Sequence, residues 1–266
     1  MAENKFELHY EFKDQKIVIN QYPREKSTDE NGVIDNTGWT CWECSNIMLR
    51  YLSKNDRIFE MSGIGGENSS QKLSVLDLSS GAGLVSISVA AGYPSVSVIA
   101  TEIPQQLDQL RKNIELANLQ GRIQIYSYLW GEPISESIWK DDGVEHLLGN
   151  KKAGRIAIAS DLLFIAIRDN RASEFSSTLI SLTKCVNCVF LGFEERLIDE
   201  ETEFMKELGK IVHVTEITGS ELSVEFSESL QGQGGGHPDT NLWIPTVLFW
   251  ESPPMKMFLL KEKVEQ

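Results

Sequence analysis

The sequence predicts an α/β fold, with a mostly parallel seven-stranded sheet covered by helices on both faces and a β-hairpin before it. From Leu73 onward, short apolar runs alternate with segments of helical periodicity. This alternation is typical of strand–helix–strand units. The chain has 266 residues, 41% of them hydrophobic, which is enough for one large domain with a full hydrophobic core.

Each predicted strand is a short apolar run bounded by polar or turn-forming residues. The seven predicted strands are residues 73–79, 96–102, 123–129, 155–161, 188–193, 212–218 and 255–260. Residues 246–250 are either a further extended piece or part of the last hairpin.

Between the strands, two helices are predicted from apolar residues that recur on one helical face. Residues 105–119 carry the stripe Leu107, Leu110, Ile114 and Ala117, and residues 200–210 carry Phe204 and Leu208. Gly-, Ser- and Asn-rich residues 62–71 and the sequence QGQGGGHP at 231–238 predict loops.

The N-terminal part is organised differently. Residues 6–12 and 16–22 alternate in polarity on either side of Asp14 and Gln15, which predicts a β-hairpin. A polar stretch, residues 23–36, follows. Residues 37–42 then open a helix whose apolar positions share one face, namely Ile47, Met48, Tyr51 and Leu52.

Charge and hydropathy exclude several classes of function. The formal net charge of -14 argues against a nucleic-acid partner, because neutralising phosphates needs clustered Lys and Arg. It would instead attract a basic protein, or it would only keep the protein in solution. No apolar run approaches the length of a membrane span, and the N-terminus lacks a signal-peptide pattern. We therefore expect a cytoplasmic or nuclear location.

Four cysteines form two C-x-x-C pairs, Cys41 with Cys44 and Cys185 with Cys188. Such pairs occur in zinc and redox sites. Here each pair lies beside an apolar stretch, and no histidine is near either one. We interpret the four residues as buried, reduced thiols and expect no metal.

The strongest functional signal is a strand followed by a glycine-rich turn and a helix start, in residues 75–85. Gly81 and Gly83 would let the backbone come close to a ligand at the carboxyl end of the first sheet strand. The turn alone is not specific. Dinucleotide-binding turns have a third glycine or an alanine where this chain has Ser86.

Two further residues, one at the end of the second strand and one after the third, indicate a nucleoside ligand. Glu102 ends a predicted strand 19 residues after Gly83, where a carboxylate can accept hydrogen bonds from both ribose hydroxyls. Trp130 follows the third strand, where an aromatic ring can wall an adenine pocket. Each residue alone could also be a solvated strand end or a core aromatic.

A fourth signal is the sequence SDLLF, residues 160–164, at the end of the fourth strand. The switch point of the sheet would present Asp161 and Phe164 to a ligand. A carboxylate can bind and orient a lysine ammonium, and an aromatic wall favours the neutral amine that accepts a methyl group. Proximity and orientation would supply most of the catalysis in such a transfer.

With these residues in view, the sequence resembles the small seven-strand, non-SET protein-lysine methyltransferases, which include enzymes acting on heat-shock chaperones, valosin-containing protein and translation elongation factors. The resemblance extends from about Lys16 to the C-terminus. Its markers, in chain order, are Thr37-Gly38 followed by Trp42, VLDLSSGAGLVSIS, TEIPQQLDQLRKNIELAN, LWGEP, ASDLLF, and GFEER ahead of Phe204.

The resemblance implies a Rossmann-like class I methyltransferase sheet whose last strand is antiparallel. The methyltransferase domain would span residues 37–266, after an N-terminal hairpin and loop extension at 1–36. The implied cofactor is S-adenosylmethionine (SAM), with S-adenosylhomocysteine as product. The implied partner is a protein substrate such as a chaperone, an AAA ATPase or a translation factor, with the enzyme acting as a monomer.

The resemblance also assigns roles to individual residues. SAM would contact Trp42, Gly81, Ala82, Gly83, Glu102, Trp130 and Ser160. Residues 161–164 match the family's Asp/Glu-x-x-Tyr/Phe motif, so that Asp161 and Phe164 are the implied catalytic residues.

The chain departs from the family pattern at three places. Ser79-Ser80 replaces a Gly-plus-small pair, and Glu102 stands where Asp is commoner. Both changes keep side-chain size or charge. Glu194-Glu195 occupies positions that are often basic, which changes the charge near the expected target entrance.

Other readings stay open from the sequence. The motifs identify the cofactor better than the acceptor, so arginine or small-molecule methylation is an alternative. A SAM-binding interaction module without turnover is another, although Asp161, Glu102 and the glycines are intact. NAD-dependent oxidoreduction lacks the third glycine and a recognisable proton-transfer group, since none of the four histidines lies in a catalytic motif.

Overall fold

The computed structural model describes residues 6–22, 27–29, 32–34, 36–55, 73–134, 136–139, 154–217 and 255–263. The predicted loops at 62–71 and 231–238 and the extended piece at 246–250 lie outside these residues. Within the described part, no helix is both long and apolar enough to cross a membrane.

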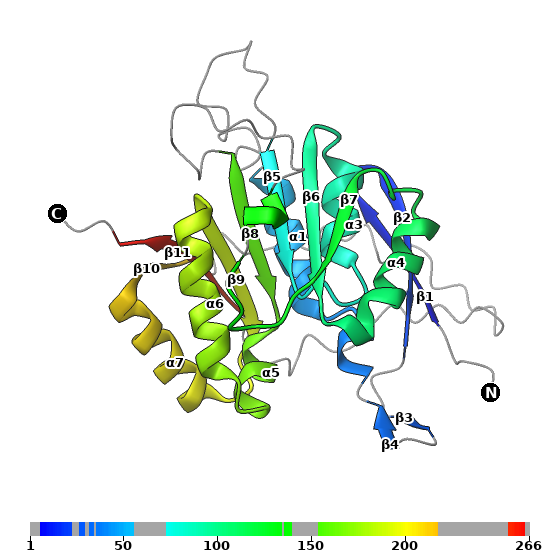
Figure 1. The fold of residues 1–266 in the computed structure, drawn as a ribbon. Coiled ribbons are helices and arrows are strands. Elements are labelled where there is room, and N and C mark those ends of the chain that lie inside the picture. The colour runs from blue at the N-terminus through cyan, green and yellow to red at the C-terminus, as the bar shows by residue number, and fades with distance from the viewer. Residues whose placement is uncertain are drawn as a thin grey trace, which may run out of the picture.

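Seven of the described strands form one central sheet in the order β10-β11-β9-β8-β5-β6-β7 (Figure 1). Their bounds are β5 Leu73–Leu78, β6 Val96–Glu102, β7 Ile123–Ser127, β8 Arg155–Ser160, β9 Cys188–Glu194, β10 Val212–Glu216 and β11 Met255–Glu262. The pairs from β9 through β8, β5 and β6 to β7 are parallel, whereas β11 runs antiparallel to both β9 and β10. The predicted fold class, including the antiparallel last strand, is confirmed.

Helices cover both faces of this sheet because strand side chains alternate between the two sides. In β5, Val75 belongs to one buried cluster while Leu76 and Leu78 belong to the other. The first cluster is built with α1 (Glu43–Lys54), α3 (Leu84–Gly92) and α4 (Leu107–Leu116). The second is built with α5 (Leu163–Arg168), α6 (Ala172–Cys185) and α7 (Ile198–Ile211).

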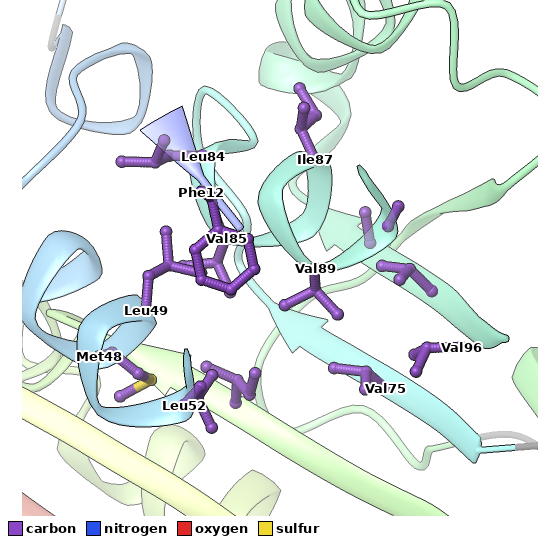
Figure 2. Packing of buried hydrophobic residues seen from close by; sticks show 14 of the residues in the cluster. Phe12, Met48, Leu49, Leu52, Val75, Leu84, Val85, Ile87, Val89 and Val96 are labelled. Atoms are coloured by element: carbon purple, nitrogen blue, oxygen red, sulfur yellow. The ribbon is translucent and has the colours of Figure 1, made fainter. Parts of the chain in front are cut away.

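The N-terminal hairpin is part of the first cluster. Strands β1 (Phe6–Phe12) and β2 (Gln15–Gln21) pair antiparallel around Lys13 and Asp14, which both have positive φ as in a tight two-residue turn. Buried side chains of both strands, Phe12, Ile17 and Ile19, join the core. Figure 2 shows Phe12 close to Leu49 of α1 and Val85 of α3. The predicted hairpin is confirmed, and it is bound to the main domain by a shared core.

Some predicted elements differ from the structure. The polar stretch at 23–36 contains a second small hairpin, with β3 (Ser27–Asp29) paired to β4 (Gly32–Ile34). The helix expected to open at 37–42 begins as a 3-10 turn, η1 (Asn36–Trp39), and α1 itself starts only at Glu43. The predicted helix at 105–119 is a 3-10 turn, η2 (Pro104–Gln106), followed by α4, which stops two residues before the left-handed Asn118.

Candidate active site

A cavity of about 660 Å³ opens beyond the carboxyl ends of β5, β6 and β8. The strand order reverses here, because β6 follows β5 on one side while β8 pairs with its other side. Ligands of open α/β sheets bind at such a switch point. The lining residues come from within five segments, 38–45, 77–85, 102–106, 130 and 160–171.

The turn after β5 brings backbone to the cavity, because Ser79, Gly81 and Gly83 adopt the left-handed conformation with φ of 53°, 58° and 92°. A Cβ atom at Gly81 would lie 2.9 Å from the carbonyl oxygen of Gly38, so glycine allows two backbone segments to touch. A Cβ atom at Gly83 would lie 2.8 Å from Leu110 Cδ1. Gly81 therefore shapes the cavity, and Gly83 lets the turn pack against α4.

Glu102, the last residue of β6, lines the cavity with a carboxylate that is only 4% exposed. Its Oε1 accepts a hydrogen bond from the Gly81 N–H at 2.9 Å, and its Oε2 accepts one from the Ile103 N–H at 2.6 Å. Burial raises the pKa of Glu102 to about 7, although both hydrogen bonds lower it. Each oxygen keeps a lone pair that can accept from a ligand hydroxyl.

Asp77 lies in β5, directly below the glycine turn, and also lines the cavity. Its Oδ2 accepts hydrogen bonds from the Ser86 N–H at 3.1 Å and the Ser86 hydroxyl at 2.5 Å. Burial raises the pKa of Asp77 to about 6, although the bonds from Ser86 and Ser80 lower it. This carboxyl ties the start of α3 to the strand, and so holds the glycine turn in shape.

Trp130 forms another part of the cavity wall, in the loop after β7. Its Nε1–H donates to the Ser79 hydroxyl at 3.0 Å, and its ring lies 4.8 Å from the fully buried ring of Phe175. Arg171 lies over the ring at 5.5 Å and donates to the Trp130 carbonyl at 3.2 Å. The ring is thus fixed from the turn on one side and from α6 on the other.

The segment before α1 closes the cavity from the N-terminal side. A Cβ atom at Gly38 would fall 1.6 Å from Gln106 Oε1, so the segment packs directly on η2. The hairpin anchors the segment, because the Tyr22 N–H donates to the Trp39 carbonyl and the Cys41 N–H donates to Gln21 Oε1, both at 3.0 Å. The N-terminal hairpin therefore helps to build the site.

Asp161 follows β8 and points its carboxylate into an ion pair. The residue is 3% exposed and has a φ of 60°. Arg196 donates to Oδ2 at 2.8 Å through Nη2 and to Oδ1 at 3.3 Å through Nη1. The Glu194 N–H also donates to Oδ1, at 3.3 Å. One residue earlier, the hydroxyls of Ser160 and Ser45 share a hydrogen bond of 3.0 Å.

The Arg196 guanidinium lies over two aromatic rings, 5.2 Å from the centre of the Trp42 ring and 5.0 Å from that of Phe164. It also forms an ion pair with Glu194. Burial lowers the pKa of Arg196, but the hydrogen bonds and charges of Asp161 and Glu194 outweigh it and raise the pKa. The carboxylate predicted to meet a substrate is thus already paired with a cation.

Comparison with known protein families places this cavity in context. The model of the lysine methyltransferase family matches residues 25–211, which is more than half of the chain and contains every cavity residue described above. The chain belongs to the lysine methyltransferase family. It is therefore a lysine methyltransferase.

Relatives and solved structures were also compared. The chain is 24% identical over 198 residues to the protein-lysine N-methyltransferase EFM6 of Saccharomyces cerevisiae, covering 71% of this chain and 76% of that protein. It is 26% identical over 107 residues to the protein-lysine N-methyltransferase EFM2 of the same yeast, covering 37% of this chain and 26% of that protein. Among solved structures, the human methyltransferase 10 domain containing protein superposes with a TM-score of 0.45 at 14% identity, covering 81% of this chain and 82% of that one.

The structure brings most of the predicted site residues of this methyltransferase together. Seven of them line the cavity, namely Trp42, Gly81, Ala82, Glu102, Trp130, Ser160 and Asp161. The other two take different places. Gly83 packs against α4, and Phe164 lies beyond Asp161, with Arg196 against its ring.

Sequence reasoning did not single out three residues that shape the site. Asp77 carried a usable signal, an acidic residue inside a buried strand just before the glycine turn. Gly38 was a family marker without an assigned role, and its close approach to Gly81 and Gln106 supplies one. Arg196 lies 35 residues beyond Asp161, so no local pattern indicates their pairing.

Of the cysteines, Cys44 is buried and the other three are half-buried. Burial raises the pKa of the Cys41 and Cys44 thiols to about 12 and that of Cys188 to about 11, so these groups are neutral thiols near pH 7. Within the part of the chain that the structure describes, no cluster of potential metal ligands is found.

Proposed function

We propose that the cavity binds SAM and that the chain transfers its methyl group to a lysine side chain of a basic protein substrate. The observation that supports this most is Glu102, a buried carboxylate at the end of β6 beside the Gly81 turn. A volume of about 660 Å³ is within the range of small-molecule and cofactor sites. When bound, SAM supplies an electrophilic methyl group.

The residues of the cavity fit that ligand by chemistry. Glu102 would accept hydrogen bonds from the two ribose hydroxyls. Trp130, with its ring fixed by Ser79 and Phe175, would wall the adenine. The backbone at Gly81 would pass close to the ligand, since no side chain stands in the way there.

The acceptor side of the cavity carries Ser160, Asp161 and Trp42. The lysine ammonium must first lose its proton to solvent, because only the neutral amine has the lone pair that accepts the methyl group. No enzyme nucleophile is required. The Asp161 carboxylate would attract the arriving ammonium and orient it, and the Trp42 ring would cover the aliphatic stem.

The charge of the chain supports a basic substrate. Its formal net charge is -14, and complementary charge speeds and orients protein encounters. Near the acceptor side, the carboxylates of Asp161 and Glu194 share the guanidinium of Arg196. A chaperone, an AAA ATPase or a translation factor that presents lysine on a basic surface fits this chemistry. The monomeric state, the cytoplasmic or nuclear location and the division at residue 37 stay predictions.

Calorimetry tests the cofactor. We expect SAM and S-adenosylhomocysteine to bind the purified chain and NAD not to bind. The variant Trp130→Ala removes the proposed adenine wall and leaves Glu102 unchanged. It should weaken the binding of SAM. NAD binding without SAM binding would contradict the cofactor assignment.

Labelling tests the transfer. The chain is incubated with methyl-labelled SAM and a lysate of cells that lack it, and labelled proteins are separated by size. We expect label in one or a few discrete protein bands. Label that stays in small molecules, or no label from a chain that binds SAM, would overturn the proposed function.

A further inference from the structure

We propose that Arg196 is a positioning residue for methyl transfer, which fixes the Asp161 carboxylate on the cavity wall and packs over the rings of Trp42 and Phe164. The acceptor lysine then reaches Asp161 from the cavity, and not from the side that the guanidinium occupies. This inference rests on the proposed function and adds a residue and a direction of approach to it.

Arg196 and Asp161 form a bidentate guanidinium–carboxylate pair. Two nitrogens of the guanidinium donate to the two oxygens of Asp161, at 2.8 Å and 3.3 Å. A bidentate pair of this kind sets the plane of the carboxylate as well as its charge. Asp161 lines the cavity, so the orientation that Arg196 gives it is the orientation that a ligand would meet.

The contacts of the Arg196 guanidinium hold it in place, so a substrate would not displace it. The Arg196 side chain is 19% exposed and touches two rings and two carboxylates. Its backbone N–H donates to both oxygens of the buried Glu201, at 3.3 Å and 3.2 Å, which ties this part of the chain to the first turn of α7. A lysine ammonium has no planar fork and would not replace these contacts.

The charges also require Arg196. Asp161 is 3% exposed and lies beside Glu194, so without a cation two carboxylates would face each other in a poorly solvated place. Removing one partner of a buried pair leaves the other charge uncompensated. Arg196 therefore compensates the charge of the buried carboxylate and holds that carboxylate in place.

Other titratable and charged groups face this cluster from each neighbouring element. They are Cys44 from α1, Arg168 from α5 at 5.9 Å from the Phe164 ring, Glu201 from α7, and Lys256 from β11, which lies 4.0 Å from Glu195. Burial raises the pKa of Cys44 to about 12, so the thiol is neutral. None of these groups replaces the fork on Asp161.

The test compares the wild type with Arg196→Met, Arg196→Lys, Asp161→Asn and the double variant Asp161→Asn/Arg196→Met. Arg111→Met is the matched control, because Arg111 pairs with Asp108 on the exposed side of α4, away from the cavity. Initial rates of protein labelling are measured in the lysate assay. They are normalised to the SAM-binding protein that calorimetry counts, so that a loss of folding is not read as a loss of rate.

We expect Arg196→Met to lose on the order of a hundredfold in rate while its SAM affinity changes little, since a misplacement of about 1 Å has such an effect. Arg196→Lys should recover part of the rate, because it keeps the charge without the fork. The double variant should lose no more than about twofold beyond Asp161→Asn, because the two residues act as one unit.

The rescue by lysine and the double variant separate positioning from a purely structural role. A positioning role predicts a lower rate with unchanged SAM affinity, partial recovery in Arg196→Lys and little further loss in the double variant. A loss of packing alone would lower the amount of folded protein and leave the rate per SAM-binding molecule near that of the wild type.

Two results would overturn the inference in distinguishable ways. If the wild type is active and the Arg196→Met variant is as fast or faster, the Arg196 side chain is dispensable or obstructs the substrate. That result would leave the proposed function intact. A wild type that binds SAM and labels no protein would remove the proposed function, and this inference with it.

Discussion

The most specific prediction concerns Glu102 and the binding of SAM. The variant Glu102→Gln keeps the shape of the side chain and removes its charge. Both carboxylate oxygens accept a backbone N–H, from Gly81 at 2.9 Å and from Ile103 at 2.6 Å. A glutamine has only one acceptor oxygen, so its amide nitrogen would oppose one of these two donors.

The magnitude follows from the lost acceptor. Hydrogen bonds to a charged group contribute about 1.5 to 3 kcal/mol each. The loss of one such bond to the ribose corresponds to a weakening of SAM binding by about 10- to 150-fold. Glu115→Gln is the matched control, since Glu115 is an exposed residue of α4, and its SAM affinity should equal that of the wild type.

The pH dependence gives a second, independent readout. Burial raises the pKa of Glu102 to about 7 in the ligand-free protein. The carboxylate form is the one that accepts both hydroxyls, so protonation competes with SAM. The wild-type affinity should therefore be about tenfold weaker near pH 6 than near pH 8. Glu102→Gln should lose most of this dependence. A slope that remains would come from other groups that titrate in this range, such as Asp77, whose pKa is raised to about 6, and the α-amino group of SAM.

Isothermal titration calorimetry at the two pH values, with circular dichroism as the folding control, measures both effects. A folded Glu102→Gln variant that binds SAM as tightly as the wild type would show that Glu102 only ties the Gly81 turn to β6. A wild-type affinity that is flat between the two pH values would refute the role of the ionised form.

Three further predictions concern the frame around the cavity. Gly81→Ala should lose about 1 to 2 kcal/mol of unfolding free energy, since the position has a φ of 58°, and should weaken SAM binding. Gly121→Ala is the control, because a Cβ atom there meets nothing within 4 Å. It should change neither the unfolding free energy, measured in urea titrations, nor the SAM affinity, measured by calorimetry. Ser86→Ala removes the 2.5 Å donor to Asp77 and should cost about 1 to 3 kcal/mol in the same urea titrations. Phe175→Ala should cost about 3 to 5 kcal/mol because the ring is fully buried, and differential scanning calorimetry would show the lower melting temperature.

The sheet was predictable because its signal is local and repeated. Strand β6 has the predicted bounds, 96–102, and β5, β7 and β8 start where predicted. Buried parallel strands are near-continuous apolar runs, and helical segments separate them. Once the strands are placed, the cavity residues Glu102 and Ser160 follow, because the carboxyl ends of parallel strands meet at one edge of the sheet.

The parts that were missed depend on contacts between distant residues. The ion pair of Asp161 with Arg196 joins the end of β8 to the residues just after β9, and its geometry depends on how the chain leaves both strands. The packing of Gly83 against Leu110 of helix α4 also joins distant residues, and the predicted contact of Gly83 with SAM stays a prediction. The small hairpin of β3 and β4 lies in a polar stretch, where no buried face supplies a periodic signal.

The measurement that tests the central claim most directly is the identity of the residue that receives the methyl group. The labelled band from the lysate is digested, and tandem mass spectrometry locates the added mass on the peptide. We predict one modified site, on the Nζ atom of a lysine with basic neighbours, and no modification when Glu102→Gln replaces the wild type under limiting SAM. Methyl groups on arginine, or spread over many unrelated sites, would contradict the assignment of this cavity to a specific protein lysine.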